Sequence, residues 1–434
     1  MSDAQMNQTG IKRPDLSQQR IRRRYAAERR FRFYGQFAVG LAIAMLGVLL
    51  FSVCSRGYSA FYRTEIALDI VLDPAVIAPG GKTDAETLAA ADYQGLVKEA
   101  LKAQFPEVTS RGDRKNLFNL VSNGAGDTVR QAVLADPKLI GSTQRFWVVA
   151  ADDMDMLAKG FIKRSLPESE RVVSDTQIAW YDKLDETGQL RTAFNTVFFS
   201  AGDSREPEQA GILGALMGSI FTMLVTVLLA LPLGVMSAIY LEEFAPKNRI
   251  TEIIEVNINN LAAVPSIVFG LLGLAVLLGV FGLPRSAPLV GGMVLALMTL
   301  PTIIIATRAA LKAVPPSIRE AAYGIGASPL QVVSHHVLPL ATPGIMTGAI
   351  IGLARALGES APLLMIGMVA FIVDVPNGPT DPATVLPVQI YLWADSPERA
   401  FIEKTSAGIM VLLAFLISMN AIAIFVRRKF ERRW

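Results

Sequence analysis

Long uncharged runs constrain this chain more than any other feature of its sequence. Five runs free of Asp, Glu, Lys and Arg are long enough to cross a bilayer, whose roughly 30 Å hydrocarbon core takes about 20 apolar residues in a helix. A sixth apolar run carries only Arg355 and Glu359. We therefore predict six transmembrane helices, within the runs Phe33–Ser55, Gln209–Leu241, Val256–Pro284, Ser286–Thr307, Leu338–Ala370 and Thr405–Val426.

Composition excludes several classes of protein. Hydrophobic residues make up 52% and charged residues 18%, against about 25% charged in a soluble domain. A net charge of +3 argues against binding to nucleic acid through bulk charge. Cys54 is the only cysteine, and we interpret it as a free thiol within the membrane. His335 and His336 are the only histidines, and we interpret them as surface residues. We therefore expect no disulfide framework, no metal site and no cofactor.

The basic residues predict how the chain is oriented. Residues 1–33 hold nine lysines and arginines, and the tail at 429–434 continues the basic run that begins at Arg427. Basic segments flanking transmembrane helices stay in the cytoplasm. We expect both termini to be cytoplasmic, which an even number of helices allows, in the bacterial inner (plasma) membrane. The basic arm could also contact nucleic acid, but we interpret it as a topology signal attracted to anionic lipid.

A polar insert follows the first helix, which we place at 34–56. It covers 57–206, is mildly acidic, and is predicted to be an extracytoplasmic α+β domain. The expected elements are strands at Glu65–Asp73 and Arg145–Ala150, helices at Tyr93–Ala103 and Asp113–Val121, and a hairpin with its turn at Asp185–Gly188. Asp152, Asp153 and Asp155 could bind a cation, but acidic residues are also favoured at a helix N-terminus, which is the interpretation we prefer.

The segment between the fourth and fifth helices is too polar to span the membrane. Ser317 has the spacing to Glu320 of a capping box, and Gly326 follows as a break. A second short helix is expected from Ser328, before Leu338-Pro339 enters the fifth span. Two short helices at an angle would form a docking surface for a partner, although an ordinary interspan loop is the alternative.

Three motifs in this region carry a resemblance to a known family. Glu320-Ala321-Ala322 with Gly326, followed by Leu338-Pro339, resembles the EAA loop of type I ABC-importer permeases, although His336 replaces the usual aliphatic residue. The stretches 263–270 (AVPSIVFG) and 354–364 (ARALGESAPLL) resemble the PstA family of phosphate-importer permeases. The likeness covers roughly residues 210–430, and the insert resembles an N-terminal domain of unknown role found on some family members.

The resemblance implies a fold and a set of partners. The fold would be an all-α polytopic membrane protein with a type I permease core at 209–428 and the α+β domain inserted. The partners would be a second, PstC-like permease, PstB-like ATP-binding subunits at the EAA loop, and a periplasmic PstS-like phosphate-binding protein. No Walker A motif is present, so we expect the chain not to be an enzyme and ATP hydrolysis to occur on another subunit.

The fifth predicted span places its glycines and its two charged residues on one face of the helix. Projected at about 100° per residue, Gly344, Gly348 and Gly352 fall on the same side as Arg355 and Glu359. Small residues four apart allow close helix packing, and intramembrane charges turn away from lipid. A guanidinium suits a phosphate oxyanion, and the nearby carboxylate would keep binding weak enough for release. The alternative is that the two charges form only a structural ion pair.

Two rival functions remain open from the sequence. The chain could be the permease of another anion or small solute. It could also be a membrane-anchored sensor whose insert binds a ligand, although a sensor has no need of the EAA spacing.

Overall fold

The computed structural model describes residues 18–369 and 371–430. The chain divides after Ser55 into two compact units. The first consists of most of α1 (Gln18–Gly57), a helix of 40 residues that includes the first predicted span. Its most apolar stretch has a mean hydropathy of 2.6, which suits a helix that crosses a membrane.

The second unit begins with a small domain built on one sheet, which we call the sheet domain (residues 58–200). A 3₁₀ turn at Tyr58–Phe61 leads into it. Its elements are β1 (Tyr62–Val71), α2 (Pro74–Ile77), α3 (Ala85–Ala90), α4 (Tyr93–Gln104), α5 (Arg111–Phe118), α6 (Ala125–Ala135), β2 (Thr143–Val149), α7 (Asp152–Ala158), α8 (Asp175–Glu186), β3 (Leu190–Phe194) and α9 (Thr196–Ser200).

The sheet has three antiparallel strands in the order β2-β1-β3. Alternation along β1 turns Ile66, Leu68 and Ile70 into the core, where each is at most 1% exposed. The opposite face carries charge, and Asp69 faces Arg145 across β1 and β2. Both strands begin and end within three residues of the sequence prediction, and β2 leads into α7 at Asp152 as expected.

The predicted hairpin is wrong. Residues 175–186 form the helix α8 rather than a strand, and the chain turns at Gly188 (φ +68°) into β3. Ser174 and Gln177 make a capping box at the start of α8, and Trp180, Tyr181 and Leu184 are buried along one face. Helical spacing and a good N-cap therefore outweigh the turn signal at Asp185–Gly188.

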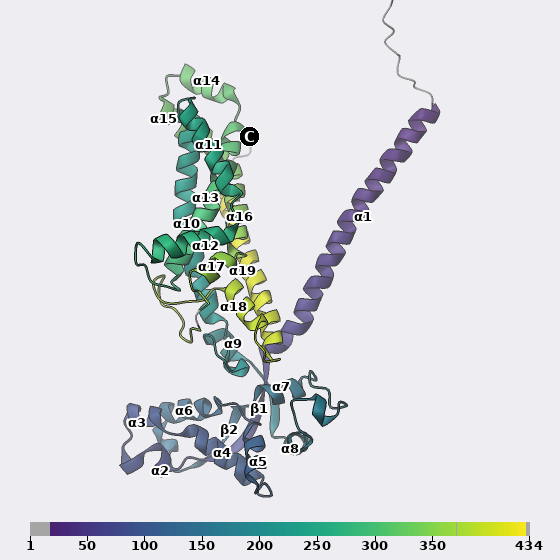
Figure 1. Ribbon diagram of the computed structural model, residues 1–434, viewed down its shortest axis with the longest axis vertical. Coiled ribbons are helices and arrows are strands. Elements are labelled where there is room, and N and C mark those ends of the chain that lie inside the picture. The colour runs from purple at the N-terminus through teal and green to yellow at the C-terminus, as the bar shows by residue number, and fades with distance from the viewer. Residues whose placement is uncertain (1–17, 370, 431–434) are drawn as a thin grey trace, which may run out of the picture. The chain divides into compact units, whose positions relative to one another are not determined.

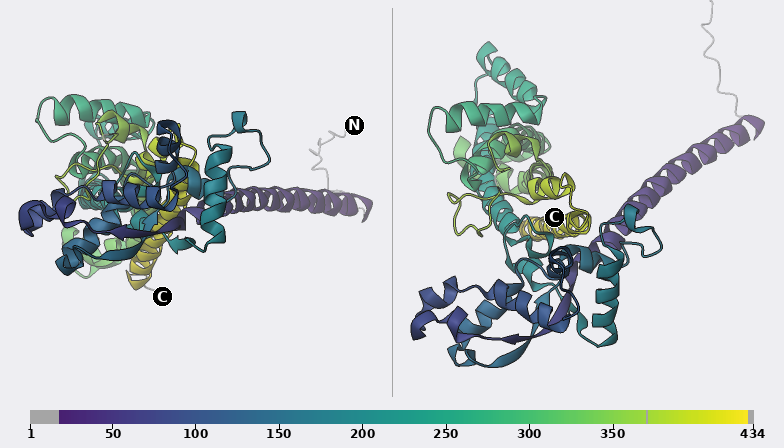
Figure 2. Two further views of the ribbon diagram at one scale, coloured as in Figure 1. Left: turned by 90° about the horizontal axis from the view of Figure 1, so that it is seen from below. Right: turned by 60° about the horizontal axis from the view of Figure 1, so that its bottom comes forward.

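The helix bundle follows the sheet domain. Its elements are α10 (Leu213–Ile239), α11 (Arg249–Ala262), α12 (Ser266–Leu272), α13 (Pro288–Lys312), α14 (Pro316–Gly324), α15 (Pro329–Gln331), α16 (Leu338–Leu357), α17 (Ala361–Met365), α18 (Leu386–Ala394) and α19 (Phe401–Phe430). The sheet domain lies at one end of this bundle and α14 at the other (Figure 1), and Figure 2 (right) shows the sheet domain below the bundle.

The third predicted span is broken rather than straight. α11 and the helix that begins at Ser266 are bent by 104° relative to each other. The break lies at Ala263–Pro265 because proline lacks an N–H and disfavours helical geometry in the residue before it. With this pair counted as one span, residues 18–369 and 371–430 contain six candidate spans, and otherwise five.

The bundle core forms where α10, α13 and α16 pack together. Met223 of α10, Val290 and Val294 of α13, and Leu353 and Ala356 of α16 are all less than 9% exposed and belong to one apolar cluster. This packing places the end of α13 and the start of α16 beside the segment that carries the EAA-like motif.

Candidate functional site

The segment from Pro316 to Pro339, which we call the coupling segment, lies at the end of the bundle away from the sheet domain (Figure 1). α14 begins at Pro316 because proline is favoured at the first helical position. The predicted capping box at Ser317 is therefore wrong, since Ser317 lies inside the helix and no side chain caps it. The capping box belongs instead to Ser328 and Gln331.

The second half of the coupling segment also differs from the prediction. α15 is not a separate short helix, because a π-helical stretch at Val332–Val337 joins it to α16. One continuous helical run therefore reaches from Pro329 to Leu357. Leu338 and Pro339, expected at the entrance of the span, lie half-buried within this run.

The turn between α14 and α15 presents apolar side chains to solvent. Gly326 adopts φ +86°, a left-handed conformation that glycine takes readily, and has open space around it. Beside it Tyr323 is 51% exposed, Ile325 80% and Leu330 67%. Of the EAA triplet, Ala322 is buried while Glu320 and Ala321 are exposed. This apolar turn has the composition of a docking surface.

Ion pairs that the sequence reasoning missed hold α14 in place. Arg319 contacts Glu243 at 2.7 Å and also donates to the carbonyls of Val314 and Leu311 at the end of α13. Nearby, Arg308 of α13 contacts Glu255 of α11 at 2.7 Å, which ties those two helices together. The signal was present in the sequence, since Glu242 and Glu243 directly follow a long uncharged run. α14 is thus tied to α13 and to the end of α10.

A mainly apolar groove runs beside the coupling segment. Its volume is about 760 Å³, and the end of α13 and the start of α16 form its walls. His335, which is exposed, and His336, which is half-buried, both line it. Within the described part of the chain, no cluster of three or more His, Cys, Asp or Glu side chains could hold a metal ion.

The three glycines of α16 face another helix of the same chain. A Cβ atom at Gly344 would lie 2.7 Å from Ala310 Cβ, and one at Gly348 would overlap Ala306. Both alanines belong to α13, so the small residues allow α16 and α13 to approach closely. At Gly352 there is more room, with the nearest α13 atoms 3.8 Å from the Cβ position.

Arg355 and Glu359 lie near the other end of α16. The helix ends at Leu357, so Glu359 falls beyond it and the projected common face does not extend that far. The Nε atom of Arg355 lies 3.7 Å from Glu359 Oε1, with the two side chains 55% and 21% exposed. The pair is loose and accessible, so the guanidinium keeps donors for another acceptor.

Two carboxyl groups of the sheet domain junction have raised pKa values. Burial raises the pKa of Glu208 to about 7, and repulsion from Asp152 and Glu206 adds to the rise. Ser122 donates a hydrogen bond to the Glu208 carboxylate, which partly offsets this rise in pKa. Burial and the neighbouring Asp153 raise the pKa of Asp152 to about 6. Both groups lie where residues 206–209 contact the sheet domain.

We expect stability at this junction to fall as the pH rises. Glu208 binds its proton more tightly in the folded protein, so its contribution to stability is fully present below about pH 4.5. Roughly 3 kcal/mol of that stability is lost as the pH rises through 7. Glu208→Gln should therefore raise the thermal unfolding midpoint in detergent at pH 8 and change it little at pH 5. An equal shift at both pH values would contradict this account.

Comparison with known proteins identifies the family. A model of binding-protein-dependent transport system inner membrane components matches residues 230–434, and a domain of unknown function, DUF3333, matches residues 18–168. The PstA 1 phosphate transport system permease protein of Mycobacterium tuberculosis is 31% identical over 52% of this chain and 74% of its own length. The chain belongs to the PstA family. The Haemophilus influenzae member is 31% identical over 56% of this chain and 83% of its own length.

Among solved structures, the MetNI methionine ABC transporter in an inward-facing conformation matches 51% of this chain and 95% of its own chain, with 19% identity and a TM-score of 0.41. As a PstA-family permease, the chain is a multi-pass inner membrane protein with an all-α core and an inserted α+β domain. The phosphate-permease resemblance predicted from residues 263–270, 320–339 and 354–364 is thereby confirmed.

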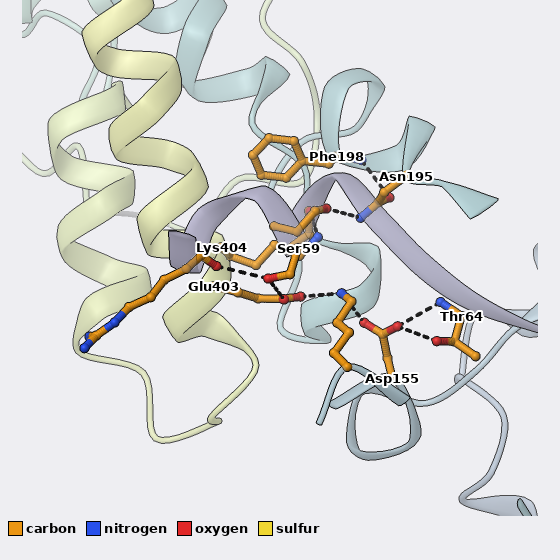
Figure 3. Close-up of polar contacts among 11 residues, drawn as sticks. Ser59, Thr64, Asp155, Asn195, Phe198, Glu403 and Lys404 are labelled. Atoms are coloured by element: carbon orange, nitrogen blue, oxygen red, sulfur yellow. Dashed lines mark hydrogen bonds and ion pairs between the residues drawn. The ribbon is translucent and has the colours of Figure 1, made fainter. Parts of the chain in front are cut away.

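One group of residues in this PstA-family chain was missed by the sequence reasoning. Glu403 and Lys404, at the start of α19, are 5% and 2% exposed, and they lie among Ser59, Asp155 and Lys159 of the sheet domain (Figure 3). The available signal was weak: a Glu-Lys pair directly before an uncharged run. Their partners are more than 200 positions away in the sequence, so only the fold brings them together.

Proposed function

We propose that this chain is the permease subunit of an ATP-driven importer of inorganic phosphate. Membership of the PstA family carries the proposal, because the curated relatives are phosphate transport permeases and the match covers most of their length. The coupling segment supports it by presenting an exposed apolar turn at one end of the bundle. The phosphate pathway through the permease would open alternately to the two sides of the membrane.

The partners follow from this assignment. A second, PstC-like permease would complete the path, PstB-like ATP-binding subunits would dock on the coupling segment and hydrolyse ATP, and a PstS-like protein would deliver phosphate. The apolar turn at Tyr323, Ile325 and Leu330 suits such docking because it is exposed. The ion pair between Arg319 and Glu243 also fixes α14, which leads into the turn. We also propose that residues 57–206 form an extracytoplasmic domain and residues 209–428 the permease core.

Arg355 is proposed to meet the anion, with Glu359 moderating its affinity. A guanidinium offers planar paired donors to phosphate and stays charged at every physiological pH. Its 55% exposure and its loose 3.7 Å contact with Glu359 support a role in binding rather than in holding the fold together.

Purification of the detergent-solubilised protein with its companions tests the function. We expect a second permease and an ATP-binding subunit to copurify. A protein that is consistently recovered alone after cross-linking in native membranes would contradict the assignment and favour a sensor.

Orientation is a separate proposal, with both termini and the coupling segment in the cytoplasm. α19 starts beside the sheet domain and carries Arg427, Arg428 and Lys429 in its last turn. Arg427 donates a hydrogen bond to Thr347 of α16. In a Cys54→Ala background, a cysteine at exposed Lys138 should react with an impermeant reagent from outside, and one at Ser328 only from inside. Labelling of position 138 only from inside would overturn this topology.

A further inference from the structure

The junction between the sheet domain and α19 is built from buried charges. Lys159 Nζ lies 2.9 Å from Glu403 Oε1 and 2.6 Å from Asp155 Oδ2 (Figure 3). Their side chains are only 5–13% exposed. Charges are seldom buried this far unless they are paired and hydrogen-bonded.

The hydrogen bonds form a continuous relay across the junction. From α19, Glu403 Oε2 accepts from Ser59 Oγ at 2.7 Å. Beyond Lys159, Asp155 Oδ1 accepts from both the N–H and the Oγ1 of Thr64 on β1 at 2.8 Å. The relay therefore runs from the membrane helix through α7 to the central strand of the sheet.

A second contact flanks the relay and balances its charge. The Nζ atom of Lys404 lies 5.1 Å above the ring of Phe198 and 3.4 Å from the carbonyl oxygen of Ala210. Asn195 holds the start of the Phe198 helix by accepting from the Phe198 N–H, and it donates to the Ala60 carbonyl. Asp155 and Glu403 are matched by Lys159 and Lys404, so the buried group as a whole is neutral.

The chain segments that join the two parts are packed rather than loose. A Cβ atom at Gly57 would lie 2.8 Å from the backbone of Ser406 and Ala407. On the return segment, Asp203 accepts from Trp393 Nε1 at 3.0 Å. Domains free to move are joined by exposed linkers with few contacts, and both connections here lie against the bundle.

We propose that this relay fixes the sheet domain to α19, so that the two move as one body during transport. This rests on the proposed permease function. The relay also links the two family matches, since Lys159 lies in the domain of unknown function and Glu403 in the transport domain. Any partner that binds the sheet domain in one state would then bias the membrane helices toward that state, because coupling between sites is reciprocal.

The test uses Glu403→Ala, which removes the relay, and Glu403→Gln, which keeps the side-chain volume but removes the charge. Lys183→Met is the matched control, because Lys183 pairs with Glu107 at 2.9 Å in the same domain with both side chains about half exposed. Spin labels at exposed Glu186 on α8 and Tyr391 on α18, in a Cys54→Ala background, report the distance between the domain and the bundle.

We expect a narrow distance distribution in the unmodified protein and in Lys183→Met, a broad one in Glu403→Ala, and an intermediate one in Glu403→Gln. Phosphate moved per ATP hydrolysed should fall by at least about fivefold in Glu403→Ala. Where Glu403→Ala fails to accumulate, Glu403→Gln decides the outcome.

Unchanged distance distributions in both Glu403 variants would overturn the proposal, as would unchanged transport per ATP in variants whose distributions broaden. The distance measurement does not depend on the substrate. A protein that carries no phosphate would therefore refute the proposed function while still reporting whether the domain and α19 are joined.

Discussion

Gly326→Glu is expected to leave the protein in the membrane and to reduce phosphate uptake to the level of membranes that lack it. Gly326 has φ +86° in the turn between α14 and α15, where a side chain with a Cβ atom costs roughly 1–2 kcal/mol. The glutamate would also place a charge beside Tyr323, Ile325 and Leu330 on the apolar turn. Desolvating that charge against a partner is unfavourable, so docking of the ATP-binding subunit should fail.

Gly326→Asn is the matched control. Asparagine tolerates the left-handed conformation better than other residues and carries no charge, so this variant should keep most uptake. Copurification of the ATP-binding subunit separates docking from expression. Normal recruitment and uptake in Gly326→Glu would show that the turn is not the docking surface.

Removing both charges of the Arg355–Glu359 pair is the second change with a large expected effect. Arg355→Met/Glu359→Leu should accumulate and recruit its partners normally, yet move no phosphate above background. The Arg355–Glu359 contact is long, at 3.7 Å, and Arg355 is 55% exposed, so we expect the pair to contribute at most about 1 kcal/mol to folding, as solvent-exposed ion pairs do. The loss should therefore arise from the missing guanidinium.

The single variants distinguish the two roles of this pair. A purely structural pair predicts that each single change harms the protein and that the double variant recovers. A binding role predicts that Arg355→Met alone is as inactive as the double variant while its abundance stays normal. Near-normal uptake by the double variant would place the anion path elsewhere.

The sequence predicted best the elements that carry a long uncharged run or a regular alternation of apolar residues. Uncharged runs mark helices in lipid directly, and the alternation of Ile66, Leu68 and Ile70 marks a strand with one buried face. Local competition caused the errors. Pro265 breaks the third span, and Pro316 starts α14 before Ser317 can cap it.

Long-range contacts were beyond the reach of sequence patterns. The glycine face of α16 could be recognised, but nothing in its spacing indicated that Ala306 and Ala310 of the same chain would cover it. Ser59 and Glu403 meet across 344 positions, and their pairing depends on how the sheet domain folds back onto α19. Such pairs follow from topology, not from local propensity.

ATP-driven uptake of labelled phosphate into vesicles that contain the purified complex tests the central claim most directly. The account predicts accumulation that requires ATP and the phosphate-binding partner and that excess unlabelled phosphate suppresses, while excess sulfate leaves it nearly unchanged. An intact, ATP-hydrolysing complex that accumulates no phosphate, or that prefers another anion, would contradict it.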